Sequence, residues 1–143
     1  MHSFRAAFFA VLFGGFVLAP AEAASPTGIW LTQKGDAHIR ISPCGQALCG
    51  TVVWLKDAVD PATGKPPVDE QNPNPRLRTR KILGLRIFAM RPNGQGTWAG
   101  SIYNSDDGQT YAGKLLWHSV DRIEVQGCAG LICGGEMWRR LGK

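Results

Sequence analysis

Hydrophobic and polar residues alternate along most of this chain with the period of two that is typical of half-buried β-strands. Between residues 37 and 42, for example, Ala37, Ile39 and Ile41 alternate with polar side chains. Similar stretches rich in β-branched and aromatic residues recur along the chain, and helical spacing is nearly absent. The pattern predicts eight strands at residues 28–32, 37–42, 50–56, 82–90, 97–104, 109–117, 121–127 and 134–141.

The three strands between residues 82 and 117 form the clearest element of this pattern. Asn93-Gly94 lies in the first turn and Asp107-Gly108 lies in the second. These pairs supply residues that adopt positive φ, which tight hairpins require. The segment therefore predicts an antiparallel meander, whose sheet the flanking strands complete.

Eight sequential strands with mostly short connections favour an all-β fold, an eight-stranded antiparallel up-and-down barrel. The interior of such a barrel is filled by side chains or holds one small ligand. A two-sheet sandwich is the alternative. An outer-membrane barrel fits less well, because strands of this length barely span a bilayer and the outward faces are charged or small.

One connection, between the third and fourth strands, is much longer than the others. Residues 57–81 contain five prolines and no hydrophobic period. Loops of this length in compact domains are usually lids, binding loops or disordered segments. The basic end of the loop, with Arg76 and Arg78, should lie at the barrel rim. We therefore expect a lid whose arginines meet the acidic head of an amphipathic ligand, the alternative being a mobile loop with no ligand role.

The first 23 residues have the pattern of a secretory signal peptide. Arg5 gives a basic start, residues 6–18 are an apolar run, and Ala21-Glu22-Ala23 fits the small-x-small cleavage rule. The run is too short and wrongly flanked for a membrane span. We expect residues 1–23 to be removed and residues 24–143 to form a single domain, periplasmic or secreted, with no transmembrane segment.

All four cysteines lie after this segment, in two pairs of identical spacing. Cys44 and Cys49 bracket one short loop between strand-like runs, and Cys128 and Cys133 bracket another. An exported chain meets an oxidising environment, and four cysteines permit three pairings. The local pairing is favoured because each bridge would clamp one hairpin. The spacing differs from that of zinc and thioredoxin-like redox sites, so neither a metal nor a cofactor is expected.

The formal net charge of +5 makes the chain mildly basic. Part of the excess is local, at Arg76, Arg78, Arg80 and Lys81. A solvated loop surface is the simpler interpretation, and a peripheral contact with anionic envelope lipid or a carboxylate is the alternative. The sequence holds no nucleic-acid-binding motif, so nucleic acid is not an expected partner.

Residues near both ends of the expected domain resemble known families. Gly28-Ile29-Trp30 resembles the Gly-x-Trp signature of lipocalins, and Trp138-Arg139-Arg140 supplies a basic residue like the one that lipocalins place beside that tryptophan. A more specific resemblance is to the bacterial family called domain of unknown function 2147, small exported lipocalin-like proteins. The resemblance implies a calycin-type barrel. The matching residues are Gly28, Trp30, Cys49-Gly50, Asp69, Asn72-Pro73-Asn74-Pro75, Arg78, Leu83-Gly84-Leu85, Gly100, Ile102-Tyr103, Asp107-Gly108, Thr110-Tyr111, Gly127, Gly135 and Trp138-Arg139.

Aromatic residues on the expected strands are mostly core, but in a barrel some also line the ligand site. We expect Gly28, Trp30 and Arg139 to be structural, with the Arg139 guanidinium over the Trp30 indole at one end of the barrel. The residues expected to contact a ligand are Trp54, Leu85, Tyr103, Tyr111, Arg76 and Arg78.

The leading functional hypothesis is an exported binding protein for a small, apolar or amphipathic molecule. An envelope structural or interaction module with a filled barrel is the alternative. An enzyme is the third hypothesis: no Gly-x-Ser-x-Gly motif occurs, and both His38 and His118 are expected at the surface, so no catalytic residue is assigned. The pattern does not indicate the oligomeric state.

Overall fold

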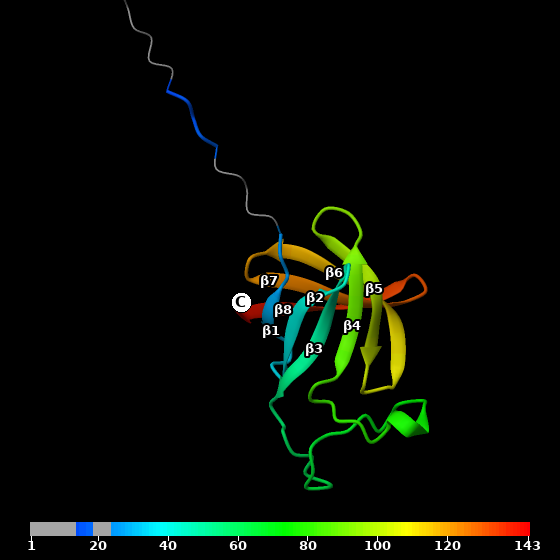
Figure 1. Cartoon of the computed structure of the whole chain (residues 1–143). Helices are drawn as coiled ribbons and strands as arrows, with labels where there is room; N and C mark the ends of the chain where they lie inside the picture. The colour runs from blue at the N-terminus through cyan, green and yellow to red at the C-terminus, as the bar shows by residue number, and fades with distance from the viewer. Residues whose placement is uncertain (1–13, 19–23) are drawn as a thin grey trace, which may run out of the picture.

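A computed structural model of the chain describes residues 14–18 and 24–143. It confirms an all-β fold, a closed barrel in which each strand pairs antiparallel with its neighbours in sequence and the first pairs with the last (Figure 1). The strands are β1 (Gly28–Leu31), β2 (Ala37–Cys44), β3 (Ala47–Leu55), β4 (Arg86–Pro92), β5 (Thr97–Asn104), β6 (Gln109–Ser119), β7 (Arg122–Ala129) and β8 (Ile132–Gly142).

The segment that we expect to be a signal peptide, residues 1–23, lies outside the described residues except for residues 14–18. Among the described residues, no helix has the length and apolar character that crossing a membrane would take. The domain expected at residues 24–143 contains all eight strands and the long loop.

The fourth strand begins later than the pattern predicted, at Arg86 and not at residue 82. Gly84 adopts a φ of 89°, and the Leu85 N–H donates to the Ile82 carbonyl at 3.0 Å, so residues 82–85 form a turn. The Gly84 N–H donates to the Val52 carbonyl, and the Leu85 carbonyl accepts from the Val52 N–H. Leu85 is buried at the barrel rim and Leu83 is exposed, so the apolar run at residues 82–85 is a turn and not part of the strand.

The core lies inside the barrel, on the apolar face of the alternating pattern. Burial of this face is the main favourable contribution to folding, as expected from the hydrophobic effect. The buried cluster comprises Trp30, Ile39, Ile41, Val52, Phe88, Met90, Leu115, Ile123, Val125 and Trp138.

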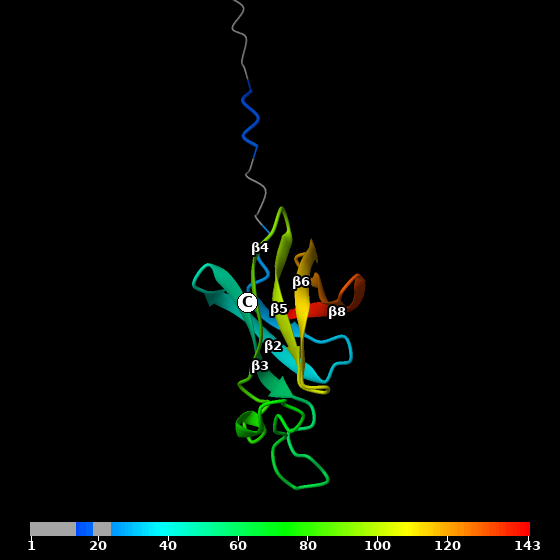
Figure 2. The ribbon, with the colours of Figure 1, turned by 90° about the vertical axis from the view of Figure 1, so that its right-hand side faces the viewer.

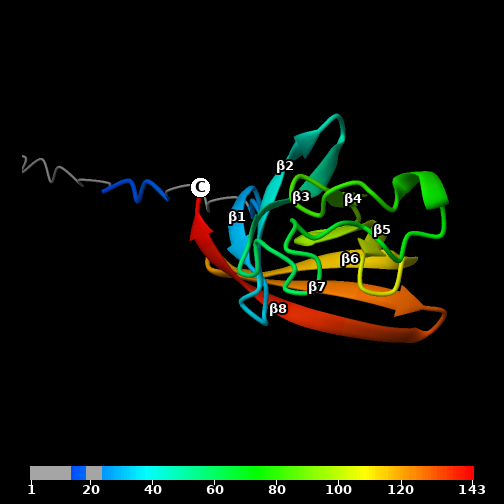
Figure 3. The same cartoon turned by 90° about the horizontal axis from the view of Figure 1, so that it is seen from below.

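The barrel has two ends with different connections. At the terminal end lie the start of β1, the end of β8 and the turns at residues 45–46, 93–96 and 120–121. At the loop end lie the turns at residues 32–36, 105–108 and 130–131 and the long loop, residues 56–85. Figure 2 shows the loop below the barrel, opposite the β4–β5 turn. Seen from below, the loop lies in front of β3, β4 and β5 (Figure 3).

Trp30 and Arg140 close the terminal end. Trp30 is fully buried and its indole N–H donates to the Pro26 carbonyl at 2.7 Å. The Arg140 guanidinium carbon lies 4.3 Å from the centroid of the Trp30 ring and 5.8 Å from that of Trp117. Guanidinium nitrogens of Arg140 also donate to the backbone carbonyls of Ser25, Thr27 and Val120. One side chain thus connects β8 with the segment before β1 and with the β6–β7 turn.

The prediction that Arg139 lies over Trp30 is therefore wrong by one residue. The pairing of β1 with β8 contains a bulge between Ile29 and Trp30, so Trp30 lies opposite Arg140. Arg139 is exposed on the outer face. Gly28 has a φ of 141°, and a Cβ there would lie 2.5 Å from the Gly142 carbonyl oxygen and 2.6 Å from an Arg140 nitrogen.

Both predicted disulfides are confirmed. Cys44–Cys49 joins β2 to β3 at the terminal end, and Cys128–Cys133 joins β7 to β8 at the loop end. Each bridge spans a single hairpin, so it fixes the pairing of two adjacent strands.

Candidate ligand-binding site

Two hollows open at the loop end of the barrel. The first cavity has a volume of about 380 Å³ and is lined by inward-facing residues of β5 to β8, among them Ile102, Tyr111, Val125, Glu136 and Trp138. Its polar part includes Lys34 and Asp106. Protein sites for small molecules typically have volumes of about 300–1,000 Å³ and an apolar lining with a few polar groups. The first cavity has both properties.

The second cavity, of about 320 Å³, lies on the other side of the same end. Its apolar wall includes Ile39, Val52 and Leu55 of β2 and β3, and the long loop contributes Pro67 and Ile82. Three residues at the end of β5 and in the turn after it line both cavities: Tyr103, Asn104 and Asp106. The two cavities therefore meet at the β5–β6 turn.

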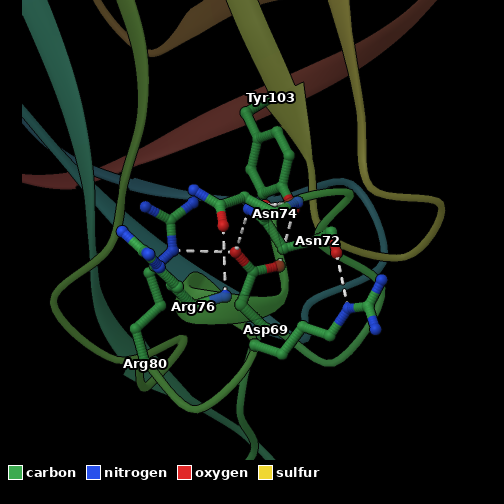
Figure 4. A network of polar contacts seen from close by, with 7 residues as sticks. Asp69, Asn72, Asn74, Arg76, Arg80 and Tyr103 are labelled. Atoms are coloured by element: carbon green, nitrogen blue, oxygen red, sulfur yellow. Dashed lines mark hydrogen bonds and ion pairs between the residues drawn. The ribbon is translucent and has the colours of Figure 1, made fainter.

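The long loop is attached to the barrel through the buried carboxylate of Asp69 (Figure 4). Tyr103 donates its hydroxyl hydrogen to Asp69 Oδ1 at 2.6 Å, and Asn72 Nδ2 donates to Asp69 Oδ2 at 2.8 Å. Arg80 Nε donates to the same Oδ2 at 2.7 Å and forms an ion pair with it. The Arg80 guanidinium also lies over the Tyr103 ring, 5.5 Å from its centroid. Three of these residues belong to the loop and Tyr103 belongs to β5, so the network joins loop to barrel.

These contacts set the protonation of the network. Burial raises the pKa of Asp69, but the hydrogen bonds from Tyr103, Asn72 and Arg80 and the charge of Arg80 outweigh it, so the pKa lies below its ordinary value of 3.8. Burial, and then the hydrogen bond to the Asp69 carboxylate, raise the pKa of Tyr103 above 10.0. Asp69 is therefore charged and Tyr103 neutral at neutral pH.

Backbone contacts fix the rest of this part of the loop. The Asp69 N–H donates to the Arg80 carbonyl, the Ile82 N–H donates to the Pro67 carbonyl, and Val68 and Lys81 form an isolated antiparallel bridge. The β5–β6 turn packs directly on the loop at Gly108, where a Cβ would lie 1.9 Å from the Gln71 carbonyl oxygen. Gly108 has a φ of 71°, so glycine meets both requirements of this position.

A second carboxylate–tyrosine pair holds the β5–β6 turn itself. Tyr111 donates its hydroxyl hydrogen to Asp107 Oδ2. This hydrogen bond lowers the pKa of Asp107 and raises that of Tyr111. Deeper in the first cavity, Trp138 Nε1 donates to Glu136 Oε2 at 3.0 Å. The aromatic N–H and O–H groups of this cavity are therefore directed to carboxylates of the protein.

The structure brings two of the six residues expected to contact a ligand into the cavities. Tyr103 lines both and Tyr111 lines the first. Leu85 is buried at the end of the loop, but it lines neither cavity. Placing Trp54 in the interior is wrong: its side chain is 41% exposed and stacks on His38 across the outer face of β2 and β3, with ring centroids 4.1 Å apart.

The two loop arginines also lie outside the cavities. Arg76 is in the 3₁₀ turn η1 (Pro75–Leu77), which has an exposed surface. Arg78 donates from Nε to the Asn72 carbonyl at 2.8 Å, so it stabilises the loop. An anionic head group held by these arginines has no support in this arrangement, because neither side chain lines a cavity.

Several functional candidates were missed from the sequence. Asp69 and Arg80 were not paired because their contact, eleven positions apart, depends on the path of an irregular loop. Glu136 and Trp138 could have been found by extending the period-two analysis, which puts both on one face of β8. Among the described residues, no group of three or more His, Cys, Asp or Glu side chains is arranged to hold a metal ion.

Comparison with known proteins agrees with this architecture. Residues 28–140 match the family described as "Uncharacterized protein conserved in bacteria (DUF2147)". No curated protein sequence matches the chain.

Among solved structures, the chain is similar to protein HP1028 from the human pathogen Helicobacter pylori, which is described as belonging to the lipocalin family. The TM-score is 0.70 with 22% sequence identity, over 83% of this chain and 84% of that protein. A likeness at this identity shows the fold, and a lipocalin-like barrel suits the binding of small molecules in general. With the family match covering nearly the whole barrel, the chain belongs to the DUF2147 family of bacterial proteins and folds as a lipocalin-like barrel.

Proposed function

We propose that this protein is an exported binding protein for a small, partly apolar or amphipathic molecule. The observation that carries the proposal is the unequal filling of the barrel. Trp30, Met90 and Leu115 are fully buried in its core, whereas the loop end contains cavities of about 380 and 320 Å³. Open hollows of this size have room for a small molecule, whereas the packed core does not.

The lining of the cavities suits a ligand with an apolar body and a polar end. Ile102, Val125 and Trp138 form an apolar wall of the first cavity, and Ile39 and Val52 do the same in the second. Their polar lining includes Asn104 and Asp106 at the β5–β6 turn. An apolar group inside is removed from water, while a polar group at the mouth keeps hydrogen-bond partners.

Export is part of the proposal. It is supported by the signal-like pattern of residues 1–23 and by two disulfides, which are typical of oxidising compartments. Mass spectrometry of the protein from its native cell should give an N-terminus near Ala24 and a mass lower by four hydrogens than the fully reduced chain. A full-length chain with free thiols would contradict export.

A cavity-filling variant tests the binding function. Gly134 lines the first cavity, and a Cβ at this position would have no atom within 4 Å. Gly134→Leu should therefore occupy part of the cavity without a clash between the new side chain and neighbouring atoms. The matched control is Ala112→Leu, on the exposed outer face of β6. Binding of the neutral apolar fluorophore N-phenyl-1-naphthylamine should weaken about tenfold or more in the first variant, or by about 1.4 kcal/mol, and stay unchanged in the second.

Two results would contradict the proposal: no binding by the folded protein, or equal affinity in both variants. In the first case an interaction module is the remaining interpretation.

A third variant tests the loop, since Pro67 and Ile82 line the second cavity. Replacing residues 58–74 with a short Gly-Ser linker should leave the barrel folded and weaken probe binding; undiminished affinity would show that the loop is no part of the site.

A further inference from the structure

The lining of the first cavity contains three aromatic side chains that carry an N–H or O–H group. Its aromatic donors are already used within the protein: Tyr103 donates to Asp69, Tyr111 donates to Asp107, and Trp138 donates to Glu136. Tyr111 and Trp138 can still offer a ligand a ring face, whereas the Tyr103 ring already lies under the Arg80 guanidinium. Of the other lining residues, Lys34 and Asn104 carry side-chain N–H groups.

The charges around both cavities are mostly negative, although the whole chain carries a net charge of +5. The first cavity is lined by Asp106 and Glu136 together with the basic Lys34, and the second by Asp36, Asp57 and Asp106. Within the described part of the chain, the ion pairs are Arg80–Asp69 and His118–Glu124, which include none of these five. The negative charge at the mouth is therefore not neutralised by a contact ion pair.

Glu136 is the most informative of these groups because of its position. It is half-buried and lies on the same face of β8 as the buried Trp138, so its carboxylate lines the hollow interior. Trp138 Nε1 donates to Oε2 and holds the side chain in place. Because this carboxylate is less hydrated than an exposed carboxylate, it attracts a positive charge more strongly.

From this arrangement we infer that the first cavity binds the cationic head of an amphiphile, an amine or quaternary ammonium group on a short apolar body. The head lies against Glu136 and the faces of Tyr111 and Trp138, because ring faces and carboxylates both attract cations. Ile102 and Val125 contact the apolar body. The position of the site is inferred from the cavity, and the positive charge of the head group is inferred from the Glu136 carboxylate. The inference rests on the proposed binding function and names the ligand class.

Three probes with the same decyl chain separate this inference from the proposed function. They are decyltrimethylammonium, neutral decyl maltoside and decyl sulfate, each titrated by calorimetry below its critical micelle concentration. We expect the cation to bind about tenfold or more tighter than the sulfate, with the difference shrinking as salt is raised. If all three bind equally, or the sulfate binds best, the cation preference is wrong but the binding function stands. If none binds, both are wrong.

A pair of variants localises the head group. Glu136→Gln removes the negative charge and keeps an oxygen that accepts from Trp138. The control is Glu124→Gln, whose carboxylate is on the neighbouring strand and bonds to Gln126 and His118 outside the cavity. We expect Glu136→Gln to weaken decyltrimethylammonium about five- to tenfold, as for a partly desolvated charge contact, and to leave decyl maltoside unchanged. Equal loss for both probes, equal loss in both variants, or no loss in Glu136→Gln would overturn the assignment of Glu136.

Discussion

An arginine lies over an aromatic ring at each end of this barrel, but the two arginines do different things. At the terminal end, Arg140 covers the fully buried Trp30 and donates to backbone carbonyls of the segment before β1 and of the β6–β7 turn. At the loop end, Arg80 covers Tyr103 and pairs with the Asp69 carboxylate. The first arginine joins parts of the barrel to one another, whereas the second fastens a loop onto it.

The difference follows from what lies beneath each arginine. Below Arg140 is packed core, so the contact is continuous with the interactions that hold the barrel together. Near Arg80 and Tyr103 are cavities, and the partner of Arg80 is a titratable group. The terminal end should therefore determine global stability, and the loop end should open locally and respond to acid.

The largest effect is expected for Trp30→Ala. This change removes a fully buried indole and its hydrogen bond to Pro26, and it leaves a large cavity in the core. We expect the free energy of unfolding to fall by about 3–5 kcal/mol, measured by chemical denaturation. Trp54→Ala, on the outer face, is the control and should cost less than about 1 kcal/mol. Similar losses in both variants would contradict the assignment of Trp30 to the closed end.

Arg140→Ala should have the next largest effect, because it removes the guanidinium over Trp30 and hydrogen bonds to backbone carbonyls. We expect a loss of about 1–3 kcal/mol. The adjacent Arg139→Ala is a matched control and should change stability by less than about 0.5 kcal/mol. Double-mutant cycles with Trp30 should give coupling for Arg140 and none for Arg139; the reverse would restore the sequence-based pairing.

Asp69→Asn should act on the loop alone. The amide is nearly isosteric with the carboxylate, but it weakens the contact with Arg80 and the hydrogen bonds from Tyr103 and Asn72. We expect the loop to lose about 1–2 kcal/mol of local stability, reduced because the Arg80 side chain is 37% exposed. Hydrogen exchange should speed up at the Asp69 and Ile82 amides while core amides keep their protection. An equal increase throughout the barrel would mean that the two ends unfold together.

The smallest effect is the response to acid. Asp69 has a folded-state pKa below its ordinary value of 3.8, so its contacts stabilise the loop above that pH and are lost as the pH falls through the folded value. The carbonyl acceptors of Arg140 do not titrate, so the terminal end lacks this response. Loop amides should therefore lose protection below about pH 4 before core amides do, and this pH dependence should be absent from Asp69→Asn. Simultaneous loss at both ends would contradict the comparison.

The sequence predicted the barrel well because strand alternation and turn residues are local signals. The strand expected at residues 97–104 was found with the same bounds, and each disulfide links two cysteines of a single hairpin. Local signals were misleading where apolar or aromatic residues lie in a turn or on the outer face of the barrel. Residues 82–85 look like strand but form a turn at the rim, and Trp54 is an aromatic strand residue that packs against His38 outside the barrel.

The candidate site depends on relationships that no local pattern contains. Arg140, and not Arg139, lies over Trp30 because the pairing of β1 with β8, at opposite ends of the barrel sequence, puts Trp30 opposite Arg140. The buried Asp69 finds Tyr103 thirty-four positions away because an irregular loop returns to the rim. The cavities form only where segments far apart in the sequence, such as the Lys34 turn and β8 or β2 and the β5–β6 turn, come together.

By itself the sequence determined an eight-stranded antiparallel barrel with two hairpin disulfides, since period-two alternation, turn glycines and cysteine spacing all act between residues close along the chain. Tertiary structure alone decided which end is packed and which is hollow, which arginine covers which ring, and which carboxylates face the cavity. The physical reason is that inside and outside become defined for each residue only when the sheet closes with a particular register, and a shift of one residue exchanges one face for the other.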